Sequence, residues 1–237
     1  MNAYITGIGW ITVDSKGCGR EHTHFSMPGG QLAEIKASDI AAELYPNFRR
    51  LDAYSRLGLA AVAFALRDAG LDQWEAKRDI GIIVSTVYGC LGTDVDYYMT
   101  VIPEGGSNAS PALFSYTSAN SFLGEAAIYF GLTGTGFAFA EQHPTGLAAL
   151  QAGLVKLFRE DSGQLLAGVC DIGCPPLFNQ PASVPAGAVF FMLEKSRGRK
   201  AQSYGQLHLS GSDPLRFNDN PVTDLTTLVQ QCLDFRL

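Results

Sequence analysis

Short apolar runs alternate with longer amphipathic segments along this chain. Runs rich in β-branched and small apolar residues predict buried strands over residues 3–13, 79–86, 135–141, 163–170 and 187–194. Between these runs, apolar residues recur at helical spacing, most clearly over 51–71, where Gly70 supplies a stop signal. The alternation predicts an α/β fold with a five-stranded, mixed, mostly parallel sheet and helices on its faces.

Weaker patterns complete this picture. Further helices are expected over 93–102, 118–132, 144–160 and 222–235, and one more strand within 201–212. No internal repeat, low-complexity segment or linker interrupts the chain. We therefore expect a single domain over residues 1–237, in which residues 213–237 form a C-terminal extension.

Composition narrows the classes of function. The 237 residues are 46% apolar and 17% charged, which is typical of a packed globular protein. The net charge is −6, and the only short basic run is at 194–200, so a nucleic-acid partner is not expected. The N-terminus reads as a strand and not as a signal peptide, and no apolar run is long enough to insert into a membrane. Five scattered cysteines favour free thiols and a cytoplasmic location.

Two groups of side chains are candidate metal ligands. One contains Cys18, His22 and His24, and the other contains Cys170 and Cys174. Neither has the paired spacing of a structural zinc site, so no metal is expected. The Gly-x-Gly of "TGIGW" lacks the rest of a dinucleotide fingerprint, and "STVYGCLG" lacks the Lys of a phosphate-binding loop. The sequence therefore predicts no cofactor.

The candidate site is the stretch "AFAEQHPTGLAALQAG" at 138–153. An apolar strand enters a sharp polar turn, and a small-residue helix, expected to open at Pro144, leaves it. This arrangement is typical of a nucleophile elbow, which presents a reactive side chain at a helix N-terminus. The turn carries Glu141, Gln142 and His143, with no Cys and no suitably placed Ser.

Six segments, in order, resemble the N-terminal half of the β-ketoacyl-acyl carrier protein synthases. They are "YITGIGWIT", "RRLDAYSRLGLAAVAFALRDAGL", "DIGIIVSTVYGCLGT", "SANSFLGEAAIYFGLTGTGFAFA", "GLAALQAG" and "AGAVFFMLEK". The resemblance covers roughly residues 3–210 and implies the N-terminal half of a thiolase-like fold. It also implies an acyltransferase ancestry.

Two departures from the family pattern limit the activity that the resemblance implies. Active synthases carry Cys, any residue, Ser or Ala, Gly and Leu at the elbow, and aligning Gly146 and Leu147 places His143 at the Cys position. A helix N-terminus disfavours a protonated imidazole, so His143 would be a poor acyl acceptor. The family's catalytic histidines lie in a C-terminal half, and no "HGTGT"-like sequence occurs here. No stand-alone condensing activity is expected.

Within the family, the chain is similar to chain-length factors, which carry Gln in place of Cys and pair with an active synthase. Gln142 lies one residue early for that match. The resemblance implies a non-catalytic partner subunit in fatty-acid or polyketide-type biosynthesis, such as the aryl-polyene pathways. It further implies a homodimer, or a heterodimer with a synthase, through residues 135–141, and contact with an acyl carrier protein.

Other interpretations stay open at this point. His143 with Glu141 could serve a small acyl-thioester decarboxylase or hydrolase, or both could be ordinary residues at a helix start. The chain could also be a degenerate remnant without a role. Phe114, Tyr116 and Phe122 could line an acyl tunnel, although aromatic residues at such spacing more often belong to the core.

Overall fold

The chain is described here from a computed structural model. The structure describes residues 1–41, 45–141, 145–159, 162–179, 184–196, 202–211 and 214–235. Its helices are α1 (Ala37–Ile40), α2 (Ala53–Asp68), α3 (Leu91–Val101), α4 (Pro111–Phe114), α5 (Ser121–Phe130), α6 (Ala148–Arg159) and α7 (Leu225–Asp234). Short 3-10 helices are η1 (Gly19–Glu21), η2 (Phe48–Arg50), η3 (Ile102–Glu104) and η4 (Pro176–Phe178). Within the described ranges, every helix is too short or too polar to cross a lipid bilayer.

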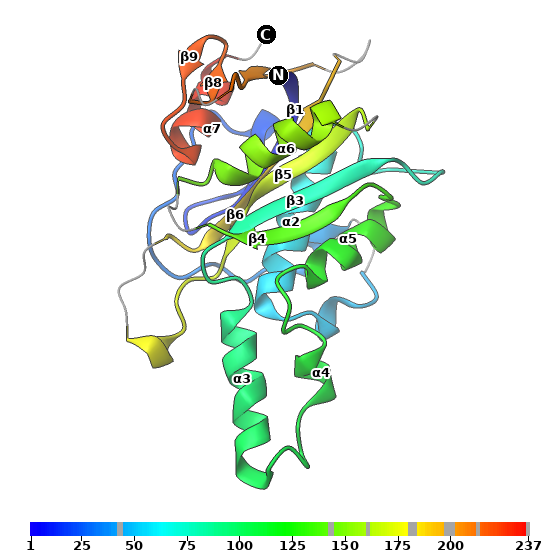
Figure 1. Cartoon of the computed structure of the whole chain (residues 1–237), viewed down its shortest axis with the longest axis vertical. Helices are drawn as coiled ribbons and strands as arrows, with labels where there is room; N and C mark the ends of the chain where they lie inside the picture. The colour runs from blue at the N-terminus through cyan, green and yellow to red at the C-terminus, as the bar shows by residue number, and fades with distance from the viewer. Residues whose placement is uncertain are drawn as a thin grey trace.

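The strands of the described chain form one nine-stranded mixed sheet (Figure 1). The strands are β1 (Asn2–Ile11), β2 (Lys16–Cys18), β3 (Ile80–Thr86), β4 (Gly136–Ala140), β5 (Gln164–Asp171), β6 (Gly187–Glu194), β7 (Gly205–His208), β8 (Arg216–Phe217) and β9 (Asn220–Pro221). Their order is β4-β3-β5-β6-β1-β7-β8-β9, and β2 pairs with β1. The five strands expected from the apolar runs are confirmed to within about two residues at each end.

The expectation of a mostly parallel five-stranded sheet is wrong. In the described sheet, only β3 with β4 and β3 with β5 are parallel pairs, and the other pairs are antiparallel. The reason lies between β5 and β6, where the described residues hold only the short η4 and no crossover helix. A parallel connection needs a crossover of a dozen or more residues, usually helical, whereas a loop returns the chain antiparallel. The further strand expected within 201–212 is confirmed as β7. The strands β2, β8 and β9 escaped the sequence analysis because they have only two or three residues each.

Alternate residues of the central strands belong to two separate hydrophobic cores, one on each face of the sheet. On β6, Phe190 and Met192 pack with α2 and α5, whereas Phe191 and Leu193 pack with α6 and α7. Figure 1 shows this division, with α6 and α7 on one face of the sheet and α2 and α5 on the other. Both faces of the central strands are therefore covered, which explains their continuous apolar sequences.

The backbone of α2 lies directly against β1. A Cβ atom built on Gly9 would lie 2.1 Å from the backbone nitrogen of Ala65, and one on Gly7 would lie 2.4 Å from the carbonyl oxygen of Ala65. Real Cβ atoms do not approach backbone atoms so closely. The glycines of "TGIGW" therefore serve helix–strand packing.

This contact predicts opposite effects for two Gly→Ala changes. Gly9→Ala should lower the free energy of unfolding by about 3 kcal/mol, because the methyl group must push α2 away from β1. Gly124→Ala lies in α5 with open space around the new Cβ. It should raise the free energy of unfolding by up to about 1 kcal/mol through helix propensity. Urea titrations of both variants measure the difference, and equal midpoints would contradict the packing argument.

Candidate functional site

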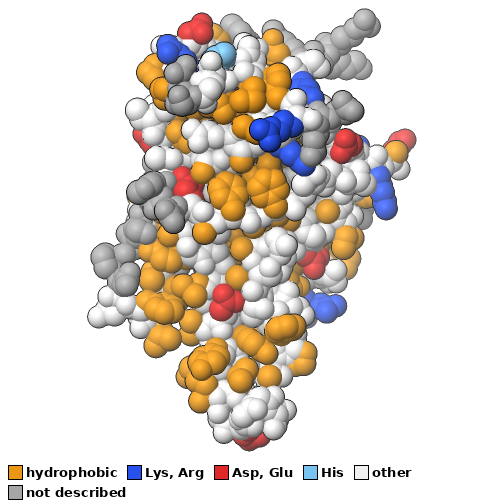
Figure 2. All heavy atoms as spheres, viewed as in Figure 1, with side chains coloured by type: hydrophobic (Ala, Val, Ile, Leu, Met, Phe, Trp, Pro, Cys, Tyr) orange, Lys and Arg blue, Asp and Glu red, His pale blue; other side chains and the backbone are white. Residues whose placement is uncertain are grey.

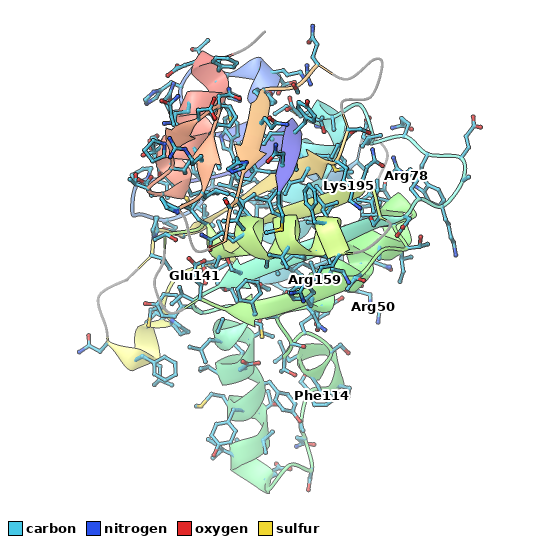
Figure 3. All side chains as sticks on the ribbon, turned by 45° about the horizontal axis from the view of Figure 1, so that its top comes forward. Arg50, Arg78, Phe114, Glu141, Arg159 and Lys195 are labelled. Atoms are coloured by element: carbon cyan, nitrogen blue, oxygen red, sulfur yellow. The ribbon has the colours of Figure 1, made fainter. Side chains whose placement is uncertain are left out.

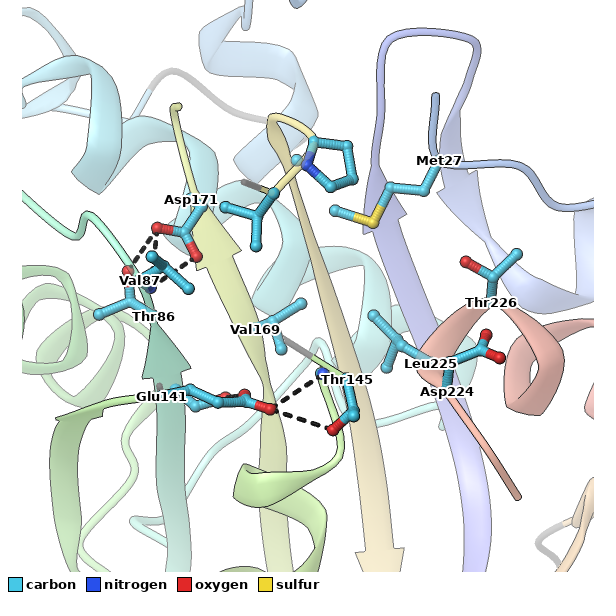
Figure 4. A pocket seen from close by; sticks show the side chains of 15 residues that line it. Met27, Thr86, Val87, Glu141, Thr145, Val169, Asp171, Asp224, Leu225 and Thr226 are labelled. Atoms are coloured by element: carbon cyan, nitrogen blue, oxygen red, sulfur yellow. Dashed lines mark hydrogen bonds between the residues drawn. The ribbon is translucent and has the colours of Figure 1, made fainter. Parts of the chain in front are cut away.

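Glu141, the first residue after β4, bridges both sides of the elbow (Figure 4). Its Oε2 accepts a hydrogen bond from the Ser85 hydroxyl at 2.8 Å. Its Oε1 accepts from the Thr145 hydroxyl and from the Gly146 backbone N–H, both at 3.1 Å. Both oxygens are thus engaged, and they join the end of β4 to Ser85 on β3 and to Thr145 and Gly146 before α6. Gln142 and His143 lie outside the described residues, so the chemistry expected of His143 stays a prediction.

The helix after the elbow begins later than expected. The sequence predicts helix 144–160, opened by Pro144, whereas α6 begins at Ala148. Gly146 has φ +72, a left-handed conformation that interrupts a helix and suits glycine. A Cβ on Gly146 would also lie 2.9 Å from the Cβ of Leu225, at the start of α7. The Thr145 carbonyl accepts the Leu225 N–H at 2.9 Å, so α7 is tied to the elbow.

A second carboxylate, Asp171, lies buried at the end of β5. It accepts the Thr86 hydroxyl at 2.7 Å and the backbone N–H groups of Val87, Tyr88 and Gly89, at 3.0, 2.7 and 3.2 Å. Burial raises the pKa of the Asp171 carboxyl, and the hydrogen bonds from the turn oppose that rise. These donors occupy the carboxylate, so Asp171 fixes the turn between β3 and α3.

A small pocket of about 150 Å³ lies between these two carboxylates and the start of α7 (Figure 4). Its walls include Met27, Val169 and Asp224, and no Lys, Arg, His or Cys is among the described residues that line it. Ligand pockets for drug-sized molecules have volumes of about 300–1,000 Å³, so this one is small for an acyl substrate. Basic side chains lie elsewhere, since Arg78, Arg159 and Lys195 are at the opposite end of the sheet from Glu141 (Figure 3).

None of the five cysteines stands at the elbow. Cys18, Cys90, Cys170 and Cys232 are buried, and Cys174 is partly buried in the segment after β5. Burial raises the pKa of Cys18 and of Cys90 to about 12, and it also raises the pKa values of Cys170 and Cys232. These four thiols stay protonated at neutral pH, and a protonated thiol is a weak nucleophile.

The candidate metal ligands are engaged in packing. Cys18 and Cys170 lie 3.4 and 3.8 Å from the carbonyl oxygens of Phe64 and Tyr54, and the His22 ring packs on Trp10. The described part of the chain contains no group of three or more His, Cys, Asp or Glu side chains arranged to hold a metal ion.

The three aromatic residues considered for a tunnel have different surroundings. Phe122 is fully buried between the rings of Tyr54 and Phe190 and belongs to the core. Tyr116 is partly buried against that core, whereas Phe114 is exposed on α4.

Sequence analysis missed the polar residues that shape this site. Asp171 lies in "CDIGC", where only the cysteines are candidate ligands, and Ser85 and Thr86 end the predicted strand 79–86. The available signal was a single acidic residue directly after a buried apolar run. In a sheet containing parallel strands, such residues gather at one edge and are candidates for a site.

The sequence matches a known protein family over most of its length. Residues 24–178 match the family described as Beta-ketoacyl synthase, N-terminal domain. The chain is 27% identical over 130 residues to 3-oxoacyl-[acyl-carrier-protein] synthase 2 of Vibrio cholerae, an alignment that covers 54% of this chain and 31% of that protein. The chain thus spans about a third of the length of this curated relative.

Solved ketosynthase structures share the fold. A ketosynthase in complex with its chain length factor from Xenorhabdus doucetiae aligns with TM-score 0.62 and 16% identity, over 98% of this chain and 92% of that chain. The ishigamide ketosynthase/chain length factor gives 0.66 and 16%, over 87% and 62%. A type II polyketide ketosynthase in complex with its acyl-carrier protein gives 0.67 and 19%, over 87% and 67%. At these identities the likeness shows a common fold, the N-terminal half of the thiolase-like ketosynthases.

The role assigned to Asp171 predicts a large loss of stability on its removal. Asp171→Ala should lower the free energy of unfolding by about 3 kcal/mol, because several N–H groups of the turn lose their acceptor. Asp224→Ala, which removes only the N-cap of α7, should cost about 1 kcal/mol. Hydrogen exchange should accelerate at residues 87–89 in the first variant alone. Similar losses of stability in both variants, with unchanged hydrogen exchange at residues 87–89, would contradict the role of Asp171 in fixing this turn.

Proposed function

The chain belongs to the beta-ketoacyl synthase family through its N-terminal domain, and from this premise we propose that it is a non-catalytic, chain-length-factor-like partner subunit. Its partner would be a condensing enzyme of fatty-acid or polyketide-type biosynthesis. One observation carries the proposal: the segment between β4 and α6 contains no cysteine. Without a thiolate there is no acceptor for the acyl group that a condensing enzyme must hold.

The surroundings of the elbow support the same proposal. Glu141 is engaged by three donors, so it is poorly placed to act as a general base for His143. The pocket beside it is small and lacks a basic side chain among its described residues. These features weigh against the alternative of a small decarboxylase or hydrolase at His143.

The edge strand β4 supports a partner of the same fold. β4 is the last strand of the described sheet, it pairs only with β3 there, and its residues are exposed or partly exposed. Phe137 and Phe139 stand on the same side of β4, and 36% of Phe137 is exposed. An apolar edge invites pairing with another strand unless it is covered. A second subunit, either a synthase or another copy of this chain, would cover it by extending the sheet.

The proposal predicts that the purified chain alone will not condense malonyl and acyl groups. Malonyl- and acyl-carrier protein would be incubated with the chain, and mass spectrometry would follow β-ketoacyl, decarboxylated and hydrolysed products. We expect the amount of each of these three products to equal that in the buffer blank. Turnover without a partner that disappears in His143→Ala would instead support the enzyme alternative.

Pairing through β4 predicts a sharp effect of charge on that strand. Phe137→Lys should abolish co-purification with the cognate synthase, or self-association in sedimentation, because a buried unpaired ammonium opposes strand pairing. Phe178→Lys, at a phenylalanine of η4 that is 44% exposed, should leave pairing intact. Far-ultraviolet circular dichroism verifies that both variants fold. A folded Phe137→Lys variant that pairs normally would exclude β4 as the interface.

A further inference from the structure

An open cavity of about 610 Å³ lies between the segment before α1, the start of α2 and the segment after β5. Its lining includes residues 30–35 together with Ile172, Cys174 and Pro176. Ligand pockets for drug-sized molecules have volumes of about 300–1,000 Å³, so this cavity is large enough for such a ligand. It shares no lining residue with the pocket beside Glu141 and is therefore a separate cavity.

Aliphatic side chains make up much of the cavity wall. Leu32, Ile35 and Ile172 line the cavity and also pack against the core beside α2. Smaller apolar lining residues are Ala33, Ala53, Pro176 and Ala186. Figure 2 shows hydrophobic side chains gathered over η4, the helix to which Pro176 belongs. No aromatic ring is among the described residues that line the cavity, so a ligand gains there by burying an alkyl chain and not by ring stacking.

Arg56 of α2 is the only cation among the described residues that line the cavity. Its guanidinium lies over the ring of Phe48, 4.8 Å from the ring centroid, and its Nη2 donates to the Arg49 carbonyl at 3.4 Å. Its Nε is buried and has no hydrogen-bond partner in the described part of the chain. A buried donor without an acceptor costs free energy, and an anionic acceptor bound in the cavity would recover it.

The charges of the lining favour a ligand with a single negative charge. Glu34, which is exposed, is the only acidic side chain among the described lining residues. Together with Arg56 it leaves the lining without net charge. A phosphate or a dicarboxylate would bring a second negative charge that no lining cation matches, whereas one carboxylate forms a charge-assisted hydrogen bond with the guanidinium.

We propose that this cavity binds an aliphatic monocarboxylate. The alkyl chain packs against Leu32, Ile35 and Ile172, and the carboxylate accepts the Arg56 Nε–H. The site lies outside the elbow and outside β4, so the inference does not rest on the proposed function. It adds a small-molecule ligand to a chain for which only a protein partner has been proposed above.

The test uses the full chain and octanoate as the probe. Isothermal titration calorimetry measures the affinity of octanoate for the wild type, for Arg56→Gln and for the matched control Arg67→Gln. Arg67 is also in α2 and also lies over an aromatic ring, 5.2 Å from the centroid of Phe64, but it does not line the cavity. Acetate, octanol and octyl phosphate are titrated as probes that lack the chain, lack the charge or carry a second charge.

The thiol of Cys174 reports where the probe binds. Cys174 lines the cavity and is partly exposed, whereas the other four cysteines are buried. Octanoate in the cavity should slow the alkylation of Cys174 by iodoacetamide, measured by peptide mass spectrometry. The same octanoate concentration should give less protection in Arg56→Gln, and circular dichroism verifies that the variants fold.

We expect Arg56→Gln to bind octanoate at least about 10-fold more weakly and Arg67→Gln to bind it like the wild type, because only the first variant loses a hydrogen bond to a charged group. Acetate and octanol should also bind more weakly than octanoate. Absence of octanoate binding at millimolar concentration, equal binding by both variants, or unprotected Cys174 would each overturn the proposal. Tighter binding of octyl phosphate would make the occupant a phosphate and overturn it too. If Arg56→Gln does not fold, the probe series and Cys174 protection in the wild type decide.

Discussion

The buried carboxylate of Asp171 is the interaction on which the arrangement of this site and of the helical segment 91–115 depends. An anion removed from water must be surrounded by donors, and the turn after β3 supplies three backbone N–H groups and the Thr86 hydroxyl. The turn can aim these donors inward because Gly89 adopts φ +54. One side chain on β5 therefore sets the path of the chain as it leaves β3 and the direction in which α3 begins.

The Glu141 carboxylate, next to the expected elbow, is likewise surrounded by hydrogen-bond donors. In a nucleophile elbow, the sharp turn serves to expose a reactive side chain. Here the Glu141 carboxylate joins the end of β4 to Thr145 and to the left-handed Gly146, and neither contact depends on a thiol. The contacts on either side of the expected elbow therefore form without a nucleophile. They retain a structural purpose because Thr145 anchors the N-terminus of α7, which covers the sheet beside α6.

Local patterns predicted the parts of the fold that local energetics determine. The central strands follow from apolar runs, and α2 follows from apolar residues at helical spacing and the stop at Gly70. The sheet's mainly antiparallel pairing depends on how distant segments meet, which no local pattern encodes. At the site, Glu141 was a candidate because it lies in the polar turn of the expected elbow. Asp171 offered only an acidic residue after an apolar run, and its role depends on contacts with a turn more than eighty residues earlier.

The body and the helical segment 91–115 differ in where their apolar side chains lie. Most large apolar side chains of the body pack in two cores, whereas Tyr98, Met99, Ile102 and Phe114 of the segment lie in solvent. The start of this segment is nevertheless held by Asp171, and its helices α3 and α4 are joined by the Tyr97–Phe114 contact. Ordering a segment on binding subtracts from affinity, and a preorganised surface avoids most of that loss. The exposed side chains of residues 91–115 therefore stand on a backbone that is already ordered.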